Sequence, residues 1–560
     1  MKAFFSFACF IVLSVAGFSQ NISWANSFVK EKSSNPEFAL TFPGLFGNNY
    51  YVMDVDRYNA VLIKKVINYI QRVDINSMTI QTDFNMSSVL EGKDIKDLGN
   101  AQNFVFKDKV YSFYIDKEDN EIYKVYSTIQ DAKDGSVVQP YKNIQAVDIT
   151  KTRLPRHITS YMTTKKEQKK YDESYAGMMA KHIKPAYDAK SIISAYIYAS
   201  VDADNSMLNV SEWNEDLKAL VSNNYKIPFK RFDLKGSSEA PWVKDFVKDR
   251  NGFFYVLIKS ANDKNENDTY LYSVYQFKLS DPLYMKVFKK EFSKNIAGEG
   301  PELFQDESGK IYLSNIGYQS DEGIPVGYNV NKAFIGRFSE TGELETIFSN
   351  NLSAEMMYNF ETEKVIDKKG AVNSLDILNI LTAPNGGCYV IWEHQWTESN
   401  ANSRGGSNYT IHNDNALVQY FNRENKVLWQ KPVFKQQEYK GTGGWFCGIA
   451  SFVLDGELHL FYPDDKKNAD KPIDHRDVSQ FSVAKFGTKD QAGIFSATMN
   501  IKGDHSRKYI YWPEDKTGYA FCVESLKYTG NKQFIGTARR IKQGAVLLKA
   551  EDYIFFKLAF

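Results

Sequence analysis

The sequence has no excess of charge of either sign. Its 69 Lys and Arg residues are balanced by 68 Asp and Glu residues, and the formal net charge is +1. A protein that binds nucleic acid concentrates basic side chains in order to neutralise phosphates. The balance of charge therefore indicates no nucleic-acid partner.

Long apolar runs are missing after the N-terminus. The opening residues MKAFFSFACFIVLSVAGFSQ combine Lys2, an apolar run through Val15, and small residues just before Gln20. This order is typical of a secretory signal peptide, and no later segment approaches the roughly 20 apolar residues of a transmembrane helix. We predict a signal peptide over residues 1–19, a single mature domain over residues 20–560, and a periplasmic, extracellular or cell-surface location.

Cysteine is scarce, with four residues in the whole chain. Cys9 lies inside the apolar run rather than after it, which does not favour lipid attachment. Cys388, Cys447 and Cys522 are far apart, so their spacing predicts neither a disulfide framework nor a metal knuckle. We expect them to be buried thiols, because unpaired cysteine behaves as a small hydrophobic residue.

Local catalytic motifs are absent as well. The chain has no His-Glu-x-x-His zinc helix, no Gly-x-Ser-x-Gly elbow, no phosphate loop and no dinucleotide-binding glycine pattern. No two histidines have the spacing of a recognisable ligand pair, so neither a metal site nor a cofactor is predicted. The sequence alone identifies no catalytic residue.

Aromatic residues are abundant, at 15% of the chain, and they fit pleated, half-buried strands well. Several segments repeat one pattern, a polar turn followed by a short alternating strand. They are KDKVYSFYID, DRNGFFYVLIKS, ESGKIYLSNIGY, PNGGCYVIWEHQW, LDGELHLFYPDD and DKTGYAFCVES. The recurrence indicates a repeat architecture built from strands.

A second repeated element follows several of these strands. In it an aromatic residue precedes a polar turn, as at Phe277, Phe338 and Phe421, and looser copies surround Tyr126, Trp213 and Phe486. The copies recur at irregular but bounded intervals, which fits units of four short strands, roughly 40 to 50 residues each, enlarged by loop insertions.

This alternation of turns and strands resembles that of β-propeller repeat proteins and covers most of the mature chain. The resemblance implies an all-β propeller of seven or eight blades, and seven is preferred because one terminal unit is expected to supply only a closing strand. The chain has no Trp-Asp series, no kelch diglycine and no sialidase-type box, so no single family's function follows. The charged stretch Met162 to Asp188 lacks strand alternation and predicts an inserted helix or long loop.

Candidate ligand-binding residues lie in two stretches. In VIWEHQWTESNANSRGGSNY, a continuous strand places Trp392, His394 and Trp396 on one face, ahead of a long polar loop. In GTGGWFCG, Trp445 lies among glycines. A flat ring flanked by polar groups is typical of a sugar or peptide site, although packing between blades explains the same residues.

Three functional classes are compatible with these observations. The first, which we favour, is an exported non-catalytic propeller whose loop face binds a glycan, a peptide or a protein partner. The second is a glycan hydrolase or lyase whose carboxylates come from different blades. The third is an outer-membrane β-barrel, suggested by the alternating C-terminal residues YIFFKLAF, which a closing strand explains equally well.

Overall fold

The structure is a computed structural model of the chain. It describes residues 21–25, 27–30, 40–60, 63–85, 102–119, 122–148, 182–200, 206–227, 242–261, 270–289, 301–317, 329–401, 407–440, 447–471, 483–485, 493–510, 519–543 and 548–559. Within these ranges, no helix is long and apolar enough to cross a membrane.

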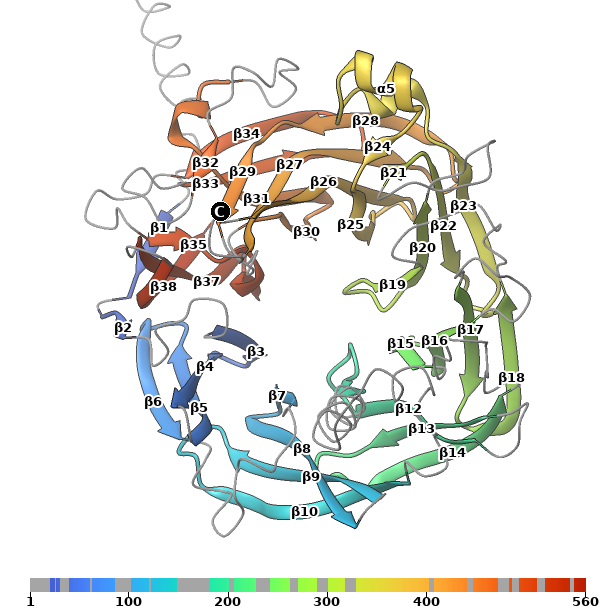
Figure 1. The fold of residues 1–560 in the computed structure, drawn as a ribbon, viewed down its shortest axis with the longest axis vertical. Helices are drawn as coiled ribbons and strands as arrows, with labels where there is room; N and C mark the ends of the chain where they lie inside the picture. Colours follow the sequence, from blue (N-terminus) through green and yellow to red (C-terminus); the bar gives the residue numbers. More distant parts are fainter. Residues whose placement is uncertain are drawn as a thin grey trace, which may run out of the picture.

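Eight antiparallel sheets, each with four main strands, surround a common centre as the blades of a β-propeller (Figure 1). The strands of blades 1 to 4 follow one another along the chain in order. Blade 1 consists of β3 (Leu40–Phe46), β4 (Asn49–Ala60), β5 (Ile63–Asp74) and β6 (Thr79–Asn85), and blade 2 of β7 (Gln102–Phe106), β8 (Lys109–Asp119), β9 (Ile122–Asp131) and β10 (Val137–Asp148). Blade 3 consists of β11 (Ile183–Pro185), β12 (Ile192–Ser200), β13 (Ser206–Trp213) and β14 (Ala219–Ile227). Blade 4 consists of β15 (Trp242–Lys248), β16 (Phe253–Ala261), β17 (Tyr270–Lys278) and β18 (Asp281–Lys289).

Blades 5 to 7 have the same plan with additional elements between strands. Blade 5 consists of β19 (Glu302–Gln305), β20 (Ile311–Gly317), β22 (Lys332–Phe338) and β23 (Leu344–Asn351). Blade 6 consists of β25 (Leu375–Thr382), β26 (Cys388–Ala401), β27 (Ser407–Phe421) and β28 (Val427–Val433). Blade 7 consists of β30 (Ala450–Leu454), β31 (Glu457–Asp464), β33 (Gly493–Met499) and β34 (His505–Ile510). The additions are the pair β21 (Asn329–Val330) and β24 (Val372–Asn373), the short helices α4 (Ala354–Met357) and α5 (Glu363–Lys369), the 3-10 helix η4 (Lys466–Asn468), and the strands β29 (Gln437–Lys440) and β32 (Ala484–Lys485), which extend blade 6.

Blade 8 joins the two ends of the chain. β35 (Tyr519–Phe521), β36 (Lys527–Gly530), β37 (Gln533–Gln543) and β38 (Leu548–Ala559) come from the C-terminal end, with the 3-10 helix η7 (Val523–Ser525) between β35 and β36. β1 (Asn21–Trp24) and β2 (Val29–Lys30) come from the N-terminal end and pair with β38, with Asn21 opposite Ala559. The first strand of the chain therefore closes the ring.

The predicted propeller is confirmed, with the larger of the two blade counts. The preference for seven blades rests on a terminal unit that supplies only a closing strand. The N-terminal unit instead forms the whole of blade 1 with residues 40–85, and the C-terminal unit, residues 519–559, forms blade 8 together with β1 as its outer strand.

The repeated aromatic residues mostly mark one position in the blades. Trp213, Phe277, Phe338 and Phe421 lie at or near the end of the third strand, before the last turn of their blades. Tyr126 lies instead inside β9, Phe486 is outside the described residues, and the last turn of blade 7 follows Met499. The intervals between these aromatic residues are irregular because insertions between strands differ from blade to blade.

The predicted insert over 162–188 is described only at its end. Residues 162–181 lie outside the described residues, and residues 183–185 form strand β11 rather than an insert. The helices that the structure does show, α4 and α5, lie between blades 5 and 6, where no helix was predicted. α4 begins after Ser353, whose hydroxyl accepts a hydrogen bond from the backbone N–H of Met356.

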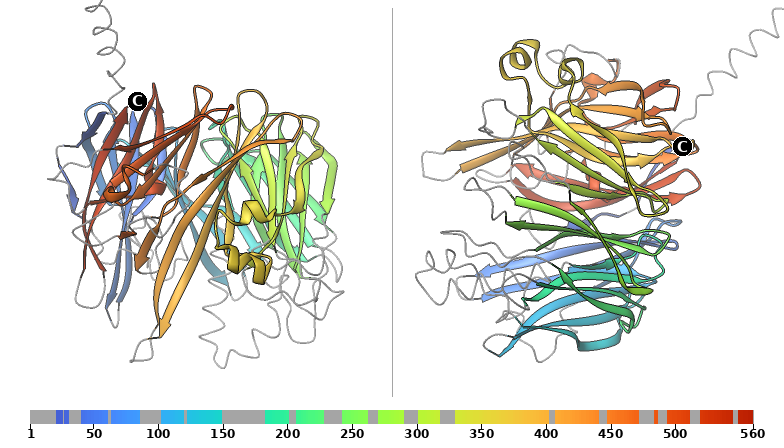
Figure 2. Two further views of the ribbon diagram at one scale, coloured as in Figure 1. Left: turned by 90° about the horizontal axis from the view of Figure 1, so that it is seen from above. Right: turned by 90° about the vertical axis from the view of Figure 1, so that its right-hand side faces the viewer.

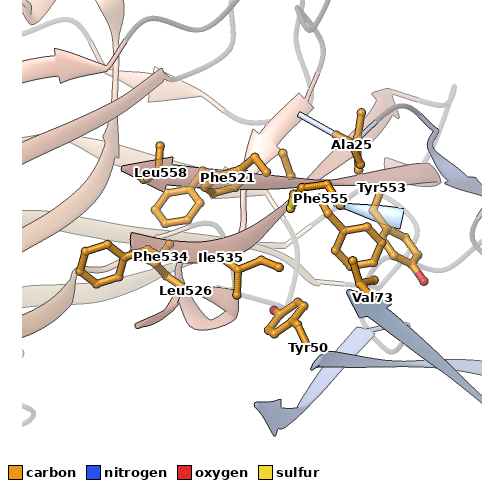
Figure 3. Close-up of a cluster of buried hydrophobic side chains, with 14 of the residues drawn as sticks. Ala25, Tyr50, Val73, Phe521, Leu526, Phe534, Ile535, Tyr553, Phe555 and Leu558 are labelled. Atoms are coloured by element: carbon orange, nitrogen blue, oxygen red, sulfur yellow. The ribbon is translucent and has the colours of Figure 1, made fainter. Parts of the chain in front are cut away.

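The core lies between neighbouring blades, because each sheet has neighbours on both faces. β20 is buried along its whole length, and between blades 4 and 5 the rings of Tyr255 and Phe338 lie 4.3 Å apart. Blades 8 and 1 pack in the same way (Figure 3), with the ring centroids of Tyr50 and Phe555 6.1 Å apart and the Tyr50 hydroxyl donating to the carbonyl of Ser525. Radial packing of this kind leaves only short sheet edges exposed.

The two ends of the ring have different connections. One face, the turn face, carries the short turns that join the first to the second strand and the third to the fourth strand of each blade. The opposite face, the loop face, carries the connections between the second and third strands and between successive blades. The hairpin of β26 and β27 (orange in Figure 2) extends farther than its neighbours on that side.

Candidate functional site

The predicted site residue Trp392 lies in the core rather than at the surface. It is fully buried on β26 in the cluster that joins blades 5 and 6, and its indole N–H donates to Oε1 of Gln419 at 2.9 Å. A ring without exposed surface cannot stack on a ligand in this conformation. For Trp392 the structure therefore shows packing between blades.

His394 and Trp396 lie near each other at the loop-face end of blade 6. The indole of Trp396 donates to Oδ2 of Asp414 at 2.9 Å, and its ring stacks on His412 with centroids 3.8 Å apart. Burial lowers the pKa of His394, against the opposing effects of the carboxylates of Asp414 and Glu361. One face of the Trp396 ring is therefore already covered by His412. Trp445, the fourth predicted residue, lies outside the described residues.

A buried ion pair lies on the opposite face of β26. Glu393 and Lys435 have fully buried side chains, with 2.7 Å between the Lys435 ammonium and Oε1 of Glu393. Oε2 of Glu393 also accepts hydrogen bonds from Gln395 and Asn413, and Lys435 donates to the backbone carbonyl of Asn413 and to Gln437. Because all four partners are internal, this network holds blade 6 together and offers no group to a ligand.

A cavity lies in the centre of the ring. Its volume is about 560 Å³, within the range of roughly 300–1,000 Å³ that small-molecule sites occupy. Its lining comes from blades 1, 5, 6, 7 and 8, and includes Leu45, Glu307, Asn379, Ser451, Phe452, Glu524, Lys527 and Tyr528. Closure of the ring therefore creates a site that no single blade contains.

Three titratable groups of this cavity have shifted pKa values. Burial raises the pKa of Glu307, and the nearby charge of Asp306 adds to the rise. Burial likewise raises the pKa of Glu524 and lowers that of Lys527, while the attraction between these two side chains opposes both shifts. The side chains of Glu307 and Glu524 line the cavity and are accessible to solvent there. Protein atoms surround them on their other sides. Shifted groups in one cavity are typical of functional sites.

Turn chemistry positions Glu307 at the inner end of blade 5. Oδ1 of Asp306 accepts hydrogen bonds from the backbone N–H groups of Ser308 and Lys310 at 2.9 and 3.0 Å. Oδ2 accepts another from the backbone N–H of Thr382 in blade 6 at 3.2 Å. Asp306 thus fixes the turn that carries Glu307 and ties it to the next blade.

Two aromatic rings give the cavity an apolar wall. Phe452 on β30 and Tyr528 on β36 both contact Phe534, with ring centroids 4.9 and 5.3 Å from it. Asn379 of blade 6 donates to the Ser451 hydroxyl of blade 7 at 3.0 Å, which places polar atoms beside the rings. The wall thus combines flat carbon surfaces with hydrogen-bonding groups.

Sequence reasoning missed this site. Glu307, Phe452 and Glu524 lie in or beside repeated turn-and-strand segments that the sequence identified only as structural. Among the described residues, no group of three or more His, Cys, Asp or Glu side chains has an arrangement that could hold a metal ion.

Comparison with known proteins identifies no family for this chain. No family model and no curated protein matches its sequence. Similar solved structures include the β-propeller domain of the trilobed protease from Pyrococcus furiosus, at 11% identity over 85% of this chain and 98% of that one, with a TM-score of 0.34. Another is an acylaminoacyl peptidase from Pyrococcus horikoshii, at 9% identity over 90% of this chain and 59% of that one, with a TM-score of 0.32. A third is an endo-arabinase from Bacteroides thetaiotaomicron, at 13% identity over 54% of this chain and 96% of that one, with a TM-score of 0.26. Likeness this weak transfers no activity to the present chain.

Proposed function

We propose that the protein is an exported propeller that binds a glycan in its central cavity. The observation that supports this is the cavity wall, where the rings of Phe452 and Tyr528 lie beside hydrogen-bonding groups of Glu307, Asn379 and Ser451. Sugars present flat apolar faces and many hydroxyl groups, and such a wall complements both. The proposed function is the binding function expected from the sequence, but its site is the centre of the ring rather than the loop face.

The site is tested by binding of the purified protein to a glycan array, with two matched substitutions. Phe452→Ala should reduce binding about tenfold, the loss expected when a stacking ring is removed. Trp396→Ala, at the loop face, should leave binding unchanged. Weaker binding by Trp396→Ala together with unchanged binding by Phe452→Ala would place the site at the loop face. The melting temperature of each variant shows whether a loss of binding is instead a loss of folding.

A second candidate, glycan hydrolysis or elimination, is favoured by one specific observation. Glu307 and Glu524 belong to blades 5 and 8 and line the same cavity, with the pKa of both raised. A carboxyl group that stays protonated can donate its proton to a leaving glycosidic oxygen, while a second carboxylate acts as base or nucleophile.

The test is incubation of the protein with polysaccharides, followed by detection of new reducing ends or unsaturated products. Glu307→Gln and Glu524→Gln should each abolish product formation. Because the acid must be protonated, the rate should fall as the pH rises through the raised pKa of that group. Turnover that survives both substitutions would exclude this pair of carboxyl groups.

Export is proposed from the N-terminal residues, which lie outside the described ranges. Cleavage before Gln20 should give a mature N-terminus at that residue, which mass spectrometry detects. A mature protein that retains Lys2 would contradict the proposal.

A further inference from the structure

Two further cavities are neighbours of the central cavity, on the side of blades 4 and 5. A cavity of about 370 Å³ shares Glu307, Ser451 and Phe452 with the central one. A third, of about 490 Å³, shares Arg250 and Lys310 with the second and lies between the turns of blades 4 and 5. The three cavities thus lie one beside the next in a row, which we call the path, and each of them is as large as an ordinary ligand site. A single small ligand would leave most of this path empty.

Most charged side chains of the rim cavity are already engaged. Glu340 pairs with Arg250, and Glu345 pairs with Arg337 at 3.0 Å. Glu343 pairs with Lys286, which does not line the cavity.

The fourth acid of the rim cavity, Asp249, organises its own turn. Its Oδ1 accepts hydrogen bonds from the backbone N–H groups of Asn251 and Phe253, each at 2.8 Å. Burial raises the pKa of Asp249, which these hydrogen bonds partly offset. The four acids therefore leave no carboxylate to neutralise a further cation in this cavity.

Lys310 is that further cation. Its backbone is fixed by the Asp306 turn, and its side chain lines both the rim cavity and the middle cavity. Within the part of the chain that the structure describes, the Lys310 ammonium makes no ion pair and no side-chain hydrogen bond. An ammonium group at the junction of two cavities provides a recognition point for an anion.

We propose that the path binds an acidic oligosaccharide, with a ligand carboxylate on Lys310 and the chain running from the rim into the central cavity. The inference rests on the proposed glycan binding and specifies both the charge and the length of the glycan. The polar residues Ser308, Thr382 and Ser451 line the intervening part of the path.

Arg250 adds to this subsite. It lines the same two cavities, and its side chain is 43% exposed while that of its partner Glu340 is 74% exposed. Exposed ion pairs contribute little to stability, so Arg250 can turn from Glu340 to a ligand carboxylate at small cost. Two cations from neighbouring blades then flank the anion.

The test measures binding of the purified protein to uronic acid oligomers of one to six units, derived from galacturonic, glucuronic and mannuronic acids. Methyl-esterified oligomers of the same length serve as neutral counterparts. Affinity should rise with length and fall about tenfold on esterification, the loss expected for one charge-assisted hydrogen bond. Lys310→Gln should weaken binding of the free acids about tenfold and leave binding of the esters unchanged.

Lys532→Gln is the control, because neither Lys532 nor its ion-pair partner Asp455 lines any of the three cavities. It should leave binding of the acidic oligomers unchanged. Equal affinity for acids and esters, or for monomers and hexamers, would overturn the inference and leave central glycan binding intact. Failure to bind any acidic or neutral glycan would instead overturn the proposed function itself, and binding of carboxyl-terminal peptides alone would assign the path to a peptide.

Discussion

At the scale of single residues, the buried ion pair of blade 6 is the clearest case of charge inside the propeller. Glu393 and Lys435 are fully buried, and each has additional hydrogen bonds to internal groups. Desolvation of two charges costs several kcal/mol, and the pair is tolerated because attraction and hydrogen bonding offset that cost. Removal of either partner therefore affects folding much more than ordinary surface substitutions do.

Lys435→Met should lower the free energy of unfolding by about 3–5 kcal/mol, because it leaves the Glu393 carboxylate buried without its partner. Urea denaturation monitored by fluorescence measures the change. The double variant with Glu393→Leu should regain most of the loss, and Lys532→Met, which removes an exposed pair with Asp455, should have no measurable effect. A single variant as stable as the wild type would contradict the importance of this pair.

His394 should make stability depend on pH. Burial lowers its pKa in the folded protein, so between that value and the ordinary value of about 6.5 the unfolded chain binds the proton more readily. The stabilising effect of neutral His394 is therefore complete above about pH 6.5 and is lost as the pH falls through this window. His394→Gln should lose less stability than the wild type between about pH 7 and pH 5, measured by urea denaturation at each pH. Parallel pH profiles would contradict the expectation.

At the scale of elements, the short turns determine how closely neighbouring blades approach. Gly342, in the turn between β22 and β23 of blade 5, has φ +81°, and a Cβ atom there would overlap Nε2 of Gln276 in blade 4. That amide cannot move freely, because it donates to Tyr255 and to the carbonyl of Gly342 and accepts from Tyr284. Gly342 thus serves both the turn and the contact between blades.

Gly252 provides a matched comparison, since its φ is +82° and a Cβ atom added there would have no other atom within 4 Å. Gly252→Ala should cost about 1 kcal/mol of unfolding free energy from left-handed strain alone. Gly342→Ala should cost about 2–4 kcal/mol, because crowding against Gln276 is added. Chemical denaturation of both variants measures the two changes in unfolding free energy. Equal losses would show that Gln276 moves aside at little energetic cost.

At the scale of the whole molecule, the ring depends on a strand from the opposite end of the chain. β1 pairs with the outer edge of β38, and the rings of Trp24 and Phe556 lie 5.6 Å apart. Without β1, β38 would present unpaired backbone groups along its edge. Such edges promote association between molecules.

Deletion of residues 21–24 should lower the melting temperature and increase association with rising protein concentration. Calorimetry and size-exclusion chromatography measure the two effects. Trp24→Ala, which keeps the strand but removes the ring, should cost about 1–3 kcal/mol and leave the state of association unchanged. A deletion variant as stable and as dispersed as the wild type would show that closure by β1 contributes little.

Much of the fold could be predicted from the sequence, because strands and tight turns depend on neighbouring residues. The alternation in ESGKIYLSNIGY and DRNGFFYVLIKS corresponds to β20 and β16, each preceded by the expected turn. Cys388, Cys447 and Cys522 are buried, as their isolated spacing predicted. The blade count was less predictable, because β1 lies about five hundred residues from its partner β38 and no local pattern indicates that pairing.

The sequence by itself determined the strand-and-turn repeat and hence the propeller, since both follow from contacts within one blade. Only the tertiary structure decided which residues line the central cavity. Blades are buried on both faces, so alternation along β26 could not distinguish the buried ring of Trp392 from the partly exposed ring of Trp396. The central cavity exists because closure of the ring brings Glu307 and Glu524 together from blades 5 and 8, and that convergence depends on long-range packing that leaves no spacing pattern in the chain.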